Sequence, residues 1–104
     1  MSKQHQFDVL IIGSGAAGVM SAIQLSENLS IALIAKDEIL EWSSYYAQGG
    51  ISAVLDSGDN FNSHISDTLN TGFNMDNADS IRFMIEQAPM AISDLETAGV
   101  KFSP

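Results

Sequence analysis

The sequence predicts an α/β fold: a βαβ unit of a parallel sheet, incomplete in this chain and followed by a helical segment. Two short apolar runs, at residues 7–12 and 31–35, flank a stretch with helical periodicity. A glycine-rich turn joins the first run to that stretch. Such a unit has a right-handed crossover and parallel strands. We expect this unit and the loop that follows it to occupy residues 1–55 together. Residues 56–104 are expected to be mainly helical.

Each element of the unit has its own signal. The run Phe7–Ile12 (FDVLII) is nearly all apolar without alternation, which is typical of a strand buried on both faces of a parallel sheet. Apolar residues then fall at helical spacing over 16–27, which predicts a helix. Asn28 is expected to adopt the left-handed conformation after its last turn. The second run, Ile31–Ala35 (IALIA), predicts the next strand.

The residues after the unit have a different pattern. Residues 39–62 are mostly irregular, and 51–55 is compatible with one short strand. Turn-forming residues dominate from position 56 onward. Residues 63–69 then predict a short helix. Its expected caps are Asn62 or Ser63 at the start and Gly72 at the end.

A longer helical pattern closes the sequence. Apolar residues between 81 and 95 share one helical face, and Asp76 or Asn77 is the expected N-cap. Pro89 lies inside the pattern, where it removes an N–H and clashes with the preceding turn. We therefore expect one kinked helix, or a second helix that begins at Pro89. Gly99 is the expected C-terminal cap.

The charge balance argues against two classes of partner. The chain has 104 residues and a formal net charge of −9, from 13 acidic and 4 basic side chains. Nucleic acid and anionic lipid are bound by clustered Lys and Arg, which this sequence lacks. Three glycines, three serines and a glutamine interrupt the uncharged stretch 9–26. We expect no nucleic-acid partner, no stable membrane insertion and a cytoplasmic location.

The sequence offers few histidines for a metal site and no residue for thiol chemistry. The sequence has no cysteine, which excludes disulfides, thiolate metal sites and a cysteine nucleophile. The two histidines, His5 and His64, are too far apart to form a local pair of metal ligands. We expect no metal site.

The glycine-rich turn predicts a dinucleotide site. Its sequence, GSGAAG at 13–18, is a G-x-G-x-x-G motif between a predicted strand and a predicted helix, as in Rossmann-like folds. Gly13 allows the tight turn, Gly15 lets the backbone approach a diphosphate, and Gly18 lets the helix pack closely on the strand. Backbone N–H groups at the helix start then face the anion, and Ser14 can add a hydroxyl. The competing interpretation is a tightly packed helix without a ligand.

The residues alone leave the dinucleotide open. The usual ribose-binding acid stands at the end of the second strand, but this chain has Ala35 and then Lys36 there. Lys36 fits an NADP site, where it reads a 2′-phosphate, and also a flavin site, where it contacts the adenosine half. It also fits an ordinary solvated lysine in a turn.

Further stretches carry a family resemblance. They are SSYYAQGGISAV at 43–54, DVLIIGSGAAG at 8–18, IAK at 34–36 and SHISDTL at 63–69. Together they resemble the flavoprotein family of succinate dehydrogenases, fumarate reductases and L-aspartate oxidases, over essentially the whole chain. The form S-x-x-Y-A-Q-G-G-I-x-A-V is most similar to that of the L-aspartate oxidases. The family's enzymes are several times longer, so we expect this chain to be the N-terminal part of an FAD-binding domain.

The resemblance implies an FAD site. Ser43 stands where many members carry a histidine bonded to the flavin, so FAD is expected to be held non-covalently. His64 is not that histidine, and we interpret it as a capping or packing residue. The resemblance implies neither a catalytic residue nor a metal ligand in this chain. The implied cofactor-binding residues are Gly13, Ser14, Gly15, Ala16, Ala17, Gly18, Lys36, Ser43, Ser44, Tyr45, Tyr46, Ala47, Gln48, Gly49 and Gly50.

The resemblance also implies an activity. A complete enzyme of this type would oxidise L-aspartate to iminoaspartate with FAD, which O2 or fumarate reoxidises, in de novo NAD biosynthesis. Its substrate is L-aspartate, its pathway partner is quinolinate synthase, and this chain alone is expected to be inactive. The alternatives are a fumarate reductase or succinate dehydrogenase flavoprotein, and a nucleotide-binding module without redox chemistry.

Overall fold

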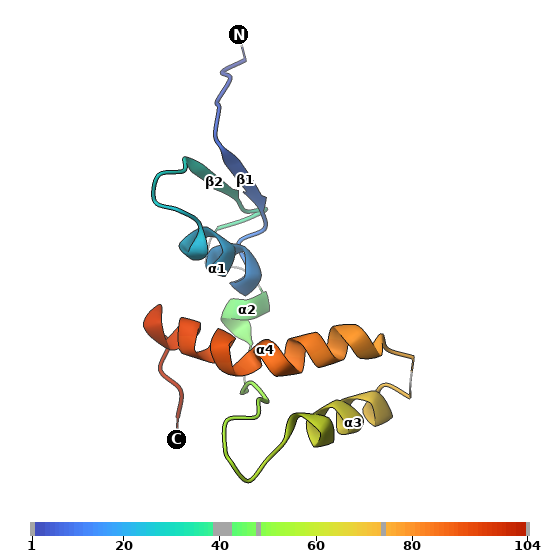
Figure 1. Cartoon of the computed structure of the whole chain (residues 1–104). Coiled ribbons are helices and arrows are strands. Elements are labelled where there is room, and N and C mark those ends of the chain that lie inside the picture. Colours follow the sequence, from blue (N-terminus) through green and yellow to red (C-terminus); the bar gives the residue numbers. More distant parts are fainter. Residues whose placement is uncertain (1, 39–42, 48, 74, 104) are drawn as a thin grey trace. The chain divides into compact units, whose positions relative to one another are not determined.

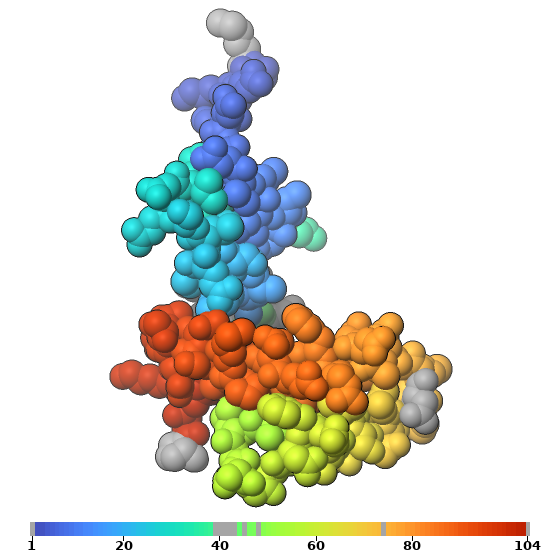
Figure 2. Space-filling model, in the orientation of Figure 1, coloured from blue at the N-terminus to red at the C-terminus, as the bar shows by residue number. Residues whose placement is uncertain are grey.

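The computed structural model describes residues 2–38, 43–47, 49–73 and 75–103 (Figure 1). The chain divides into two compact units, Met1–Gly49 and Gly50–Pro104. In the space-filling view the first unit runs from blue to green and the second from yellow-green to red (Figure 2). Each unit is described by itself.

The first unit is the predicted βαβ unit. Strands β1 (Val9–Ile12) and β2 (Ile31–Ile34) pair in parallel, and helix α1 (Ala16–Gln24) connects them. The register runs from Val9 opposite Ile31 to Ile12 opposite Ile34. Among the described residues the sheet has these two strands. The β-branched and apolar composition of both runs therefore gave the correct element type and pairing.

One face of the sheet is covered and the other is not. Burial alternates along β1, where Val9 and Ile11 are half-buried while Leu10 and Ile12 are 55% and 82% exposed. Helix α1 lies on the Ile11 side, because a Cβ atom added at Gly18 would lie 3.4 Å from Ile11 Cγ2. The expectation of burial on both faces is therefore wrong within the part of the chain that the structure describes.

The ends of these elements differ from the prediction. Helix α1 stops at Gln24 rather than at 27, because Leu25 is extended (φ −72°, ψ 152°). Its N–H still donates to the Ser21 carbonyl at 3.2 Å. Asn28 does not adopt positive φ, and among the described residues other than glycine only Phe73 does. The left-handed end predicted for this helix is therefore wrong.

Hydrogen bonds join the amino ends of the two strands. The Asp8 carboxylate accepts the Ser30 N–H at 2.8 Å and the Ser30 hydroxyl at 2.7 Å. These bonds hold the pKa of the Asp8 carboxyl below its usual range, since they stabilise its charged form. The Asp8 N–H in turn donates to the Ser30 carbonyl at 2.9 Å. Strand β1 thus begins at Val9, directly after this pair.

The second unit is helical. Helices α3 (Phe61–Thr71) and α4 (Ala78–Thr97) pack side by side (Figure 1). The buried apolar residues of the unit are Val54, Ile65, Ile85 and Ile92. Residues 51–55 form no strand, and Val54 instead adds an apolar side chain from an irregular segment. Among the described helices none is both long and apolar enough to cross a membrane.

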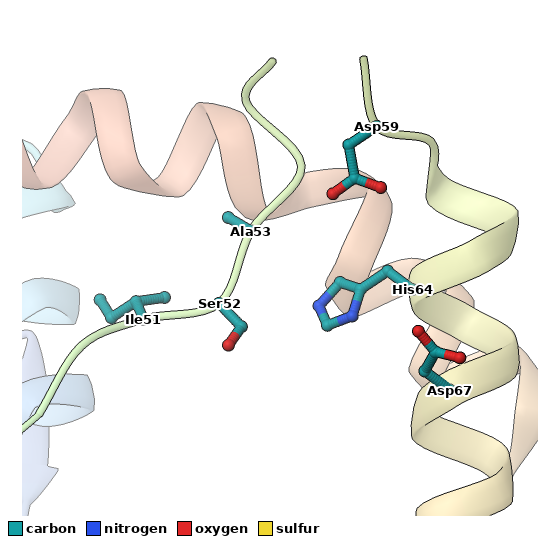
Figure 3. Close-up of a pocket in the computed structure, with 6 residues that line it drawn as sticks. All are labelled: Ile51, Ser52, Ala53, Asp59, His64 and Asp67. Carbon is teal, nitrogen blue, oxygen red and sulfur yellow. The ribbon is translucent and has the colours of Figure 1, made fainter. Parts of the chain in front are cut away.

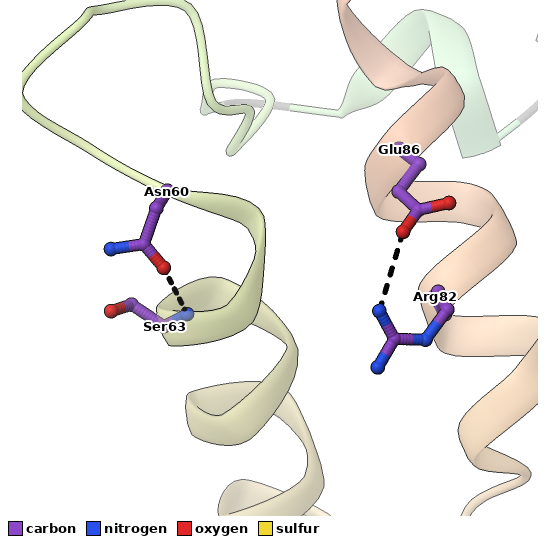
Figure 4. A network of polar contacts seen from close by, with 4 residues as sticks. All are labelled: Asn60, Ser63, Arg82 and Glu86. Carbon is purple, nitrogen blue, oxygen red and sulfur yellow. Dashed lines mark hydrogen bonds and ion pairs between the residues drawn. The ribbon is translucent and has the colours of Figure 1, made fainter.

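Asparagine side chains cap both helices of this unit. The Asn60 carboxamide oxygen accepts the Ser63 N–H at 2.8 Å, so α3 begins at Phe61 (Figure 4). The predicted caps Asn62 and Ser63 are wrong, because both lie inside the first turn. Asn77 caps α4 as one of the two expected residues, accepting the Ser80 N–H at 2.9 Å.

Helix α4 is one element of 20 residues with Pro89 in its interior. The alternative of a second helix beginning at Pro89 is therefore wrong. The buried residues Ile85 and Ile92 lie on either side of the proline, so packing holds both halves of the helix. An exposed ion pair from Arg82 to Glu86, at 3.3 Å, lies in its first half (Figure 4).

Gly72 and Gly99 end the two helices close to where they were expected. Gly72 is the C-cap of α3. Ala98 is the C-cap of α4, and Gly99 follows it with φ +105°. The N–H groups of Gly99 and Val100 donate to the carbonyls of Glu96 and Leu95, both at 3.0 Å. This bond pair is a Schellman motif, which requires the left-handed residue that glycine supplies.

Candidate functional site

The turn after β1 is fixed to the end of β2. Gly13 has φ +114°, a conformation that other residues rarely adopt. Its N–H donates to the Ile34 carbonyl at 2.9 Å. The turn therefore lies at the carboxyl edge of the parallel strands, where ligands bind in open α/β sheets.

Gly18 makes a close approach between the helix and the turn. A Cβ atom built at this position would overlap the carbonyl oxygen of Gly13 and would lie 3.0 Å from the Gly13 carbonyl carbon. Because the obstruction is backbone, no side-chain rotation relieves it. Gly18 thus has the geometry predicted for the third glycine, which is close packing of the helix on the strand and turn.

The start of α1 presents backbone donors to an anion. Gly15 is the N-cap, extended at φ −69° and ψ −179°, and no side chain caps the helix from this position. The Gly15 carbonyl accepts the Val19 N–H at 3.0 Å, which is the first bond of the helix. The first turn carries no acidic residue, so the positive end of the helix dipole is not neutralised there. Ser14, beside this turn, is buried with 8% of its surface exposed.

Lys36 lies at the same edge of the sheet. Strand β2 ends at Ile34, whose carbonyl holds Gly13, and Lys36 follows two residues later as an exposed side chain. The carboxyl ends of parallel strands share one edge, so Lys36 and the glycine turn belong to the same side of the unit. A lysine thus stands in the region where many dinucleotide sites carry an acid.

In the segment that begins at Ser43, the Ser44 side chain touches the glycine turn. Residues Ser43–Tyr46 form the short helix α2, which was expected to be irregular. The Ser44 hydroxyl oxygen accepts the Ala16 N–H at 3.3 Å. A Cβ atom added at Gly15 would lie 3.5 Å from that same oxygen. Sequence reasoning missed this contact, because the two partners are 28 residues apart.

The other predicted residues of this segment differ in exposure and in backbone conformation. Tyr46 and Ala47 are exposed, and Gly49 has φ +131°, which suits a tight backbone turn. Gln48 lies outside the described residues, and Gly50 begins the second unit. The structure therefore brings Gly13 to Gly18, Lys36 and Ser44 to one side of the first unit.

A pocket of the second unit contains His64. The pocket, of about 380 Å³, has Asp59, His64 and Asp67 on its wall (Figure 3). His64 and Asp67 also border a neighbouring hollow with Asp76. His64 was expected to be a capping or packing residue. Asn60 caps α3, so of these two interpretations the half-buried position of His64 fits packing. In the part of the chain that the structure describes, no three His, Cys, Asp or Glu residues are arranged to hold a metal ion.

The fold and the turn define a class of protein. The chain belongs to the family of FAD-binding domains, whose family model, described as "FAD binding domain", matches residues 8–104. A βαβ unit with a glycine-rich turn before α1 is what such a domain requires to hold a diphosphate.

Within this class, the chain is similar to several L-aspartate oxidases. The chain is 47% identical to the L-aspartate oxidase of Pseudomonas aeruginosa over 103 residues, 99% of this chain and 19% of that protein. It is 38% identical to the L-aspartate oxidase of Acinetobacter baylyi, over the same shares. It is also 38% identical to the chloroplastic L-aspartate oxidase of rice, over 92% of this chain and 15% of that protein. The predicted resemblance is confirmed, and the chain spans less than a fifth of the length of these relatives.

Proposed function

We propose that this chain is the FAD-binding portion of an enzyme that oxidises L-aspartate to iminoaspartate. The observation that carries the proposal is 47% identity to an L-aspartate oxidase over 99% of this chain, which itself has a complete G-x-G-x-x-G turn. FAD, when bound, accepts the hydride that the amino acid loses. The chain spans 19% of that relative, and the whole activity is proposed for the protein that carries this sequence.

The glycine turn would hold the diphosphate with backbone donors. Helix α1 begins at Ala16 with its dipole directed at the turn, and the close packing at Gly18 fixes the helix start in place. Neutral N–H donors suit this chain, since an anion can bind there without a basic patch despite the net charge of −9. Gly13, Ser14, Gly15, Ala16, Ala17 and Gly18 form this cradle in the proposal. The N–H groups of Gly13 and Ala16 are bonded to Ile34 and Ser44, so those of the other residues would face the diphosphate.

Lys36 and the segment after it would hold the two ends of the cofactor. Lys36, exposed at the carboxyl edge of β2, suits the adenosine ribose. The proposed flavin side comprises Ser43, Ser44, Tyr45, Tyr46, Ala47, Gln48, Gly49 and Gly50. A serine at position 43 offers no imidazole for a covalent flavin bond, so the cofactor would be held without one.

The finer biological setting follows from the same proposal. The oxidised flavin would be regenerated by O2 or fumarate, and the product would pass to quinolinate synthase in de novo NAD biosynthesis. A cytoplasmic location agrees with these steps. No residue of this chain is proposed as the acid or base of the reaction.

The test is a visible spectrum of the purified protein that carries this sequence, recorded without oxygen before and after L-aspartate is added. We expect a flavin absorption band that L-aspartate bleaches, and flavin that acid releases into solution. Bleaching by succinate alone, or flavin retained after acid, would move the protein to the dehydrogenase side of the family. A colourless protein that binds NADP would contradict the flavin proposal altogether.

A further inference from the structure

The Ser44 side chain links helix α2 to the start of helix α1 in the first unit. Its hydroxyl oxygen lies 3.3 Å from the Ala16 nitrogen, at the first residue of α1. It also lies 3.5 Å from the position of a Cβ atom at Gly15. Both neighbours belong to the glycine turn, whereas Ser44 lies on α2.

We propose that Ser44 is a positioning residue that holds the 43–47 segment against the glycine turn, so that the flavin half of FAD is recognised together with its diphosphate. This inference rests on the proposed function. A residue that holds this segment in place matters for the flavin half of FAD and not for its adenosine diphosphate half, and its removal also frees the Ala16 N–H.

The geometry gives the reason. The Ala16 N–H is one of the donors at a helix start that no intrahelical carbonyl satisfies. By accepting it, Ser44 ties the start of α1 to a segment whose own helix has only four residues and is too short to be stable by itself.

The size of the effect follows from the bond that is lost. One hydrogen bond of this kind changes an equilibrium by about three- to tenfold. Ser44→Ala should therefore raise the Kd for FAD by about three- to tenfold and leave the Kd for ADP within about twofold. Ser44→Thr keeps the hydroxyl and should bind FAD nearly as the unaltered chain does.

The matched control is Ser21→Ala. Ser21 lies on α1, and its hydroxyl donates to the Ala17 carbonyl at 2.7 Å within that helix. This variant removes a serine hydroxyl from the same unit without touching the 43–47 segment. Its affinities for FAD and ADP should both stay unchanged.

The experiment titrates FAD and ADP into the four chains and records the amide spectrum of each by NMR without ligand. In Ser44→Ala, the Ala16 amide proton should move upfield because it loses its acceptor, while that of Val19 should stay in place. Equal weakening of FAD and ADP would overturn the inference, since Ser44 would then contact the diphosphate directly. An unmoved Ala16 signal would also overturn it. If the unaltered chain bound ADP but not FAD, the proposed function itself would fail.

Discussion

Asp8 and Ser30 join the amino ends of the two parallel strands by a reciprocal set of hydrogen bonds. The Asp8 carboxylate accepts the Ser30 N–H and hydroxyl, at 2.8 and 2.7 Å, while the Asp8 N–H donates to the Ser30 carbonyl at 2.9 Å. The glycine turn lies at the opposite, carboxyl edge, where the Gly13 N–H holds the Ile34 carbonyl. Hydrogen bonds outside the strand pairing thus join the two strands at both ends of the sheet.

This pair predicts a pH dependence of stability. The Ser30 bonds lower the pKa of Asp8 in the folded chain, so folding is favoured by the charged carboxylate. The contribution is complete above the pKa of the unfolded carboxyl and is lost as the pH falls through the lower, folded value. Asp8→Asn should therefore lower the urea midpoint at pH 7, and the difference from the unaltered chain should shrink in acid, below about pH 4.

The control for this measurement is Asp37→Asn, an exposed carboxylate on the same unit. It removes the same charge without disturbing the strand ends. If both variants had the same midpoint at pH 7, the account of the Asp8 and Ser30 pair would be wrong.

Gly18 should not tolerate a side chain. Gly18→Ala places a methyl group against the backbone of Gly13, and the required shift should cost about 1–3 kcal/mol of unfolding free energy. Gly58→Ala is the matched control, because nothing lies within 4 Å of a Cβ atom there. Urea denaturation of both variants provides the comparison. A Gly18 variant as stable as the Gly58 variant would contradict the close approach of α1 to the turn.

The capping assignment of α3 can be tested between two nearby asparagines. Asn60→Ala removes the acceptor of the Ser63 N–H and should cost about 0.5–2 kcal/mol. Asn62→Ala changes an exposed residue inside the first turn and should alter stability by less than about 0.5 kcal/mol. Thermal unfolding followed by circular dichroism measures both. The reverse order of effects would restore the assignment that the sequence alone suggested.

Pro89 should be a destabilising residue. It lacks an N–H for the Ile85 carbonyl, so Pro89→Ala restores a donor in the interior of α4 and should raise the unfolding free energy by about 1 kcal/mol or more. Gln87→Ala, an exposed change on the same helix, supplies the comparison. A loss of stability in Pro89→Ala would mean that the packing of the proline ring outweighs the missing hydrogen bond.

The features that could be predicted from the sequence are those encoded by composition and spacing. The β-branched runs identified both strands, and the spacing of Gly13, Gly15 and Gly18 identified the turn at their carboxyl edge. Lys36 lies two residues after the end of the second strand, close to where the run 31–35 predicts it, and its role at the cofactor stays a prediction. The structure bears out the local geometry of this part of the candidate site.

Some helix ends and some contacts between distant residues could not be predicted from local sequence patterns. Several residues of the DNFNS stretch can cap a helix, and only the extended backbone of Asn60 (φ −146°, ψ 152°) selects one of them. The early end of α1 follows from the extended conformation of Leu25, an apolar residue that gives no stop signal. The contact of Ser44 with Ala16 joins positions 28 residues apart, which periodicity cannot indicate.

The central claim is that the glycine turn of this chain holds the diphosphate of FAD. The most direct measurement is a titration of FAD into the purified chain, followed by flavin fluorescence, with NADP as the competing ligand and Gly18→Ala as the altered chain. We predict saturable, acid-releasable binding of one FAD per chain that NADP does not displace and that Gly18→Ala abolishes. Binding of NADP in place of FAD, or equal FAD binding by both chains, would contradict the account.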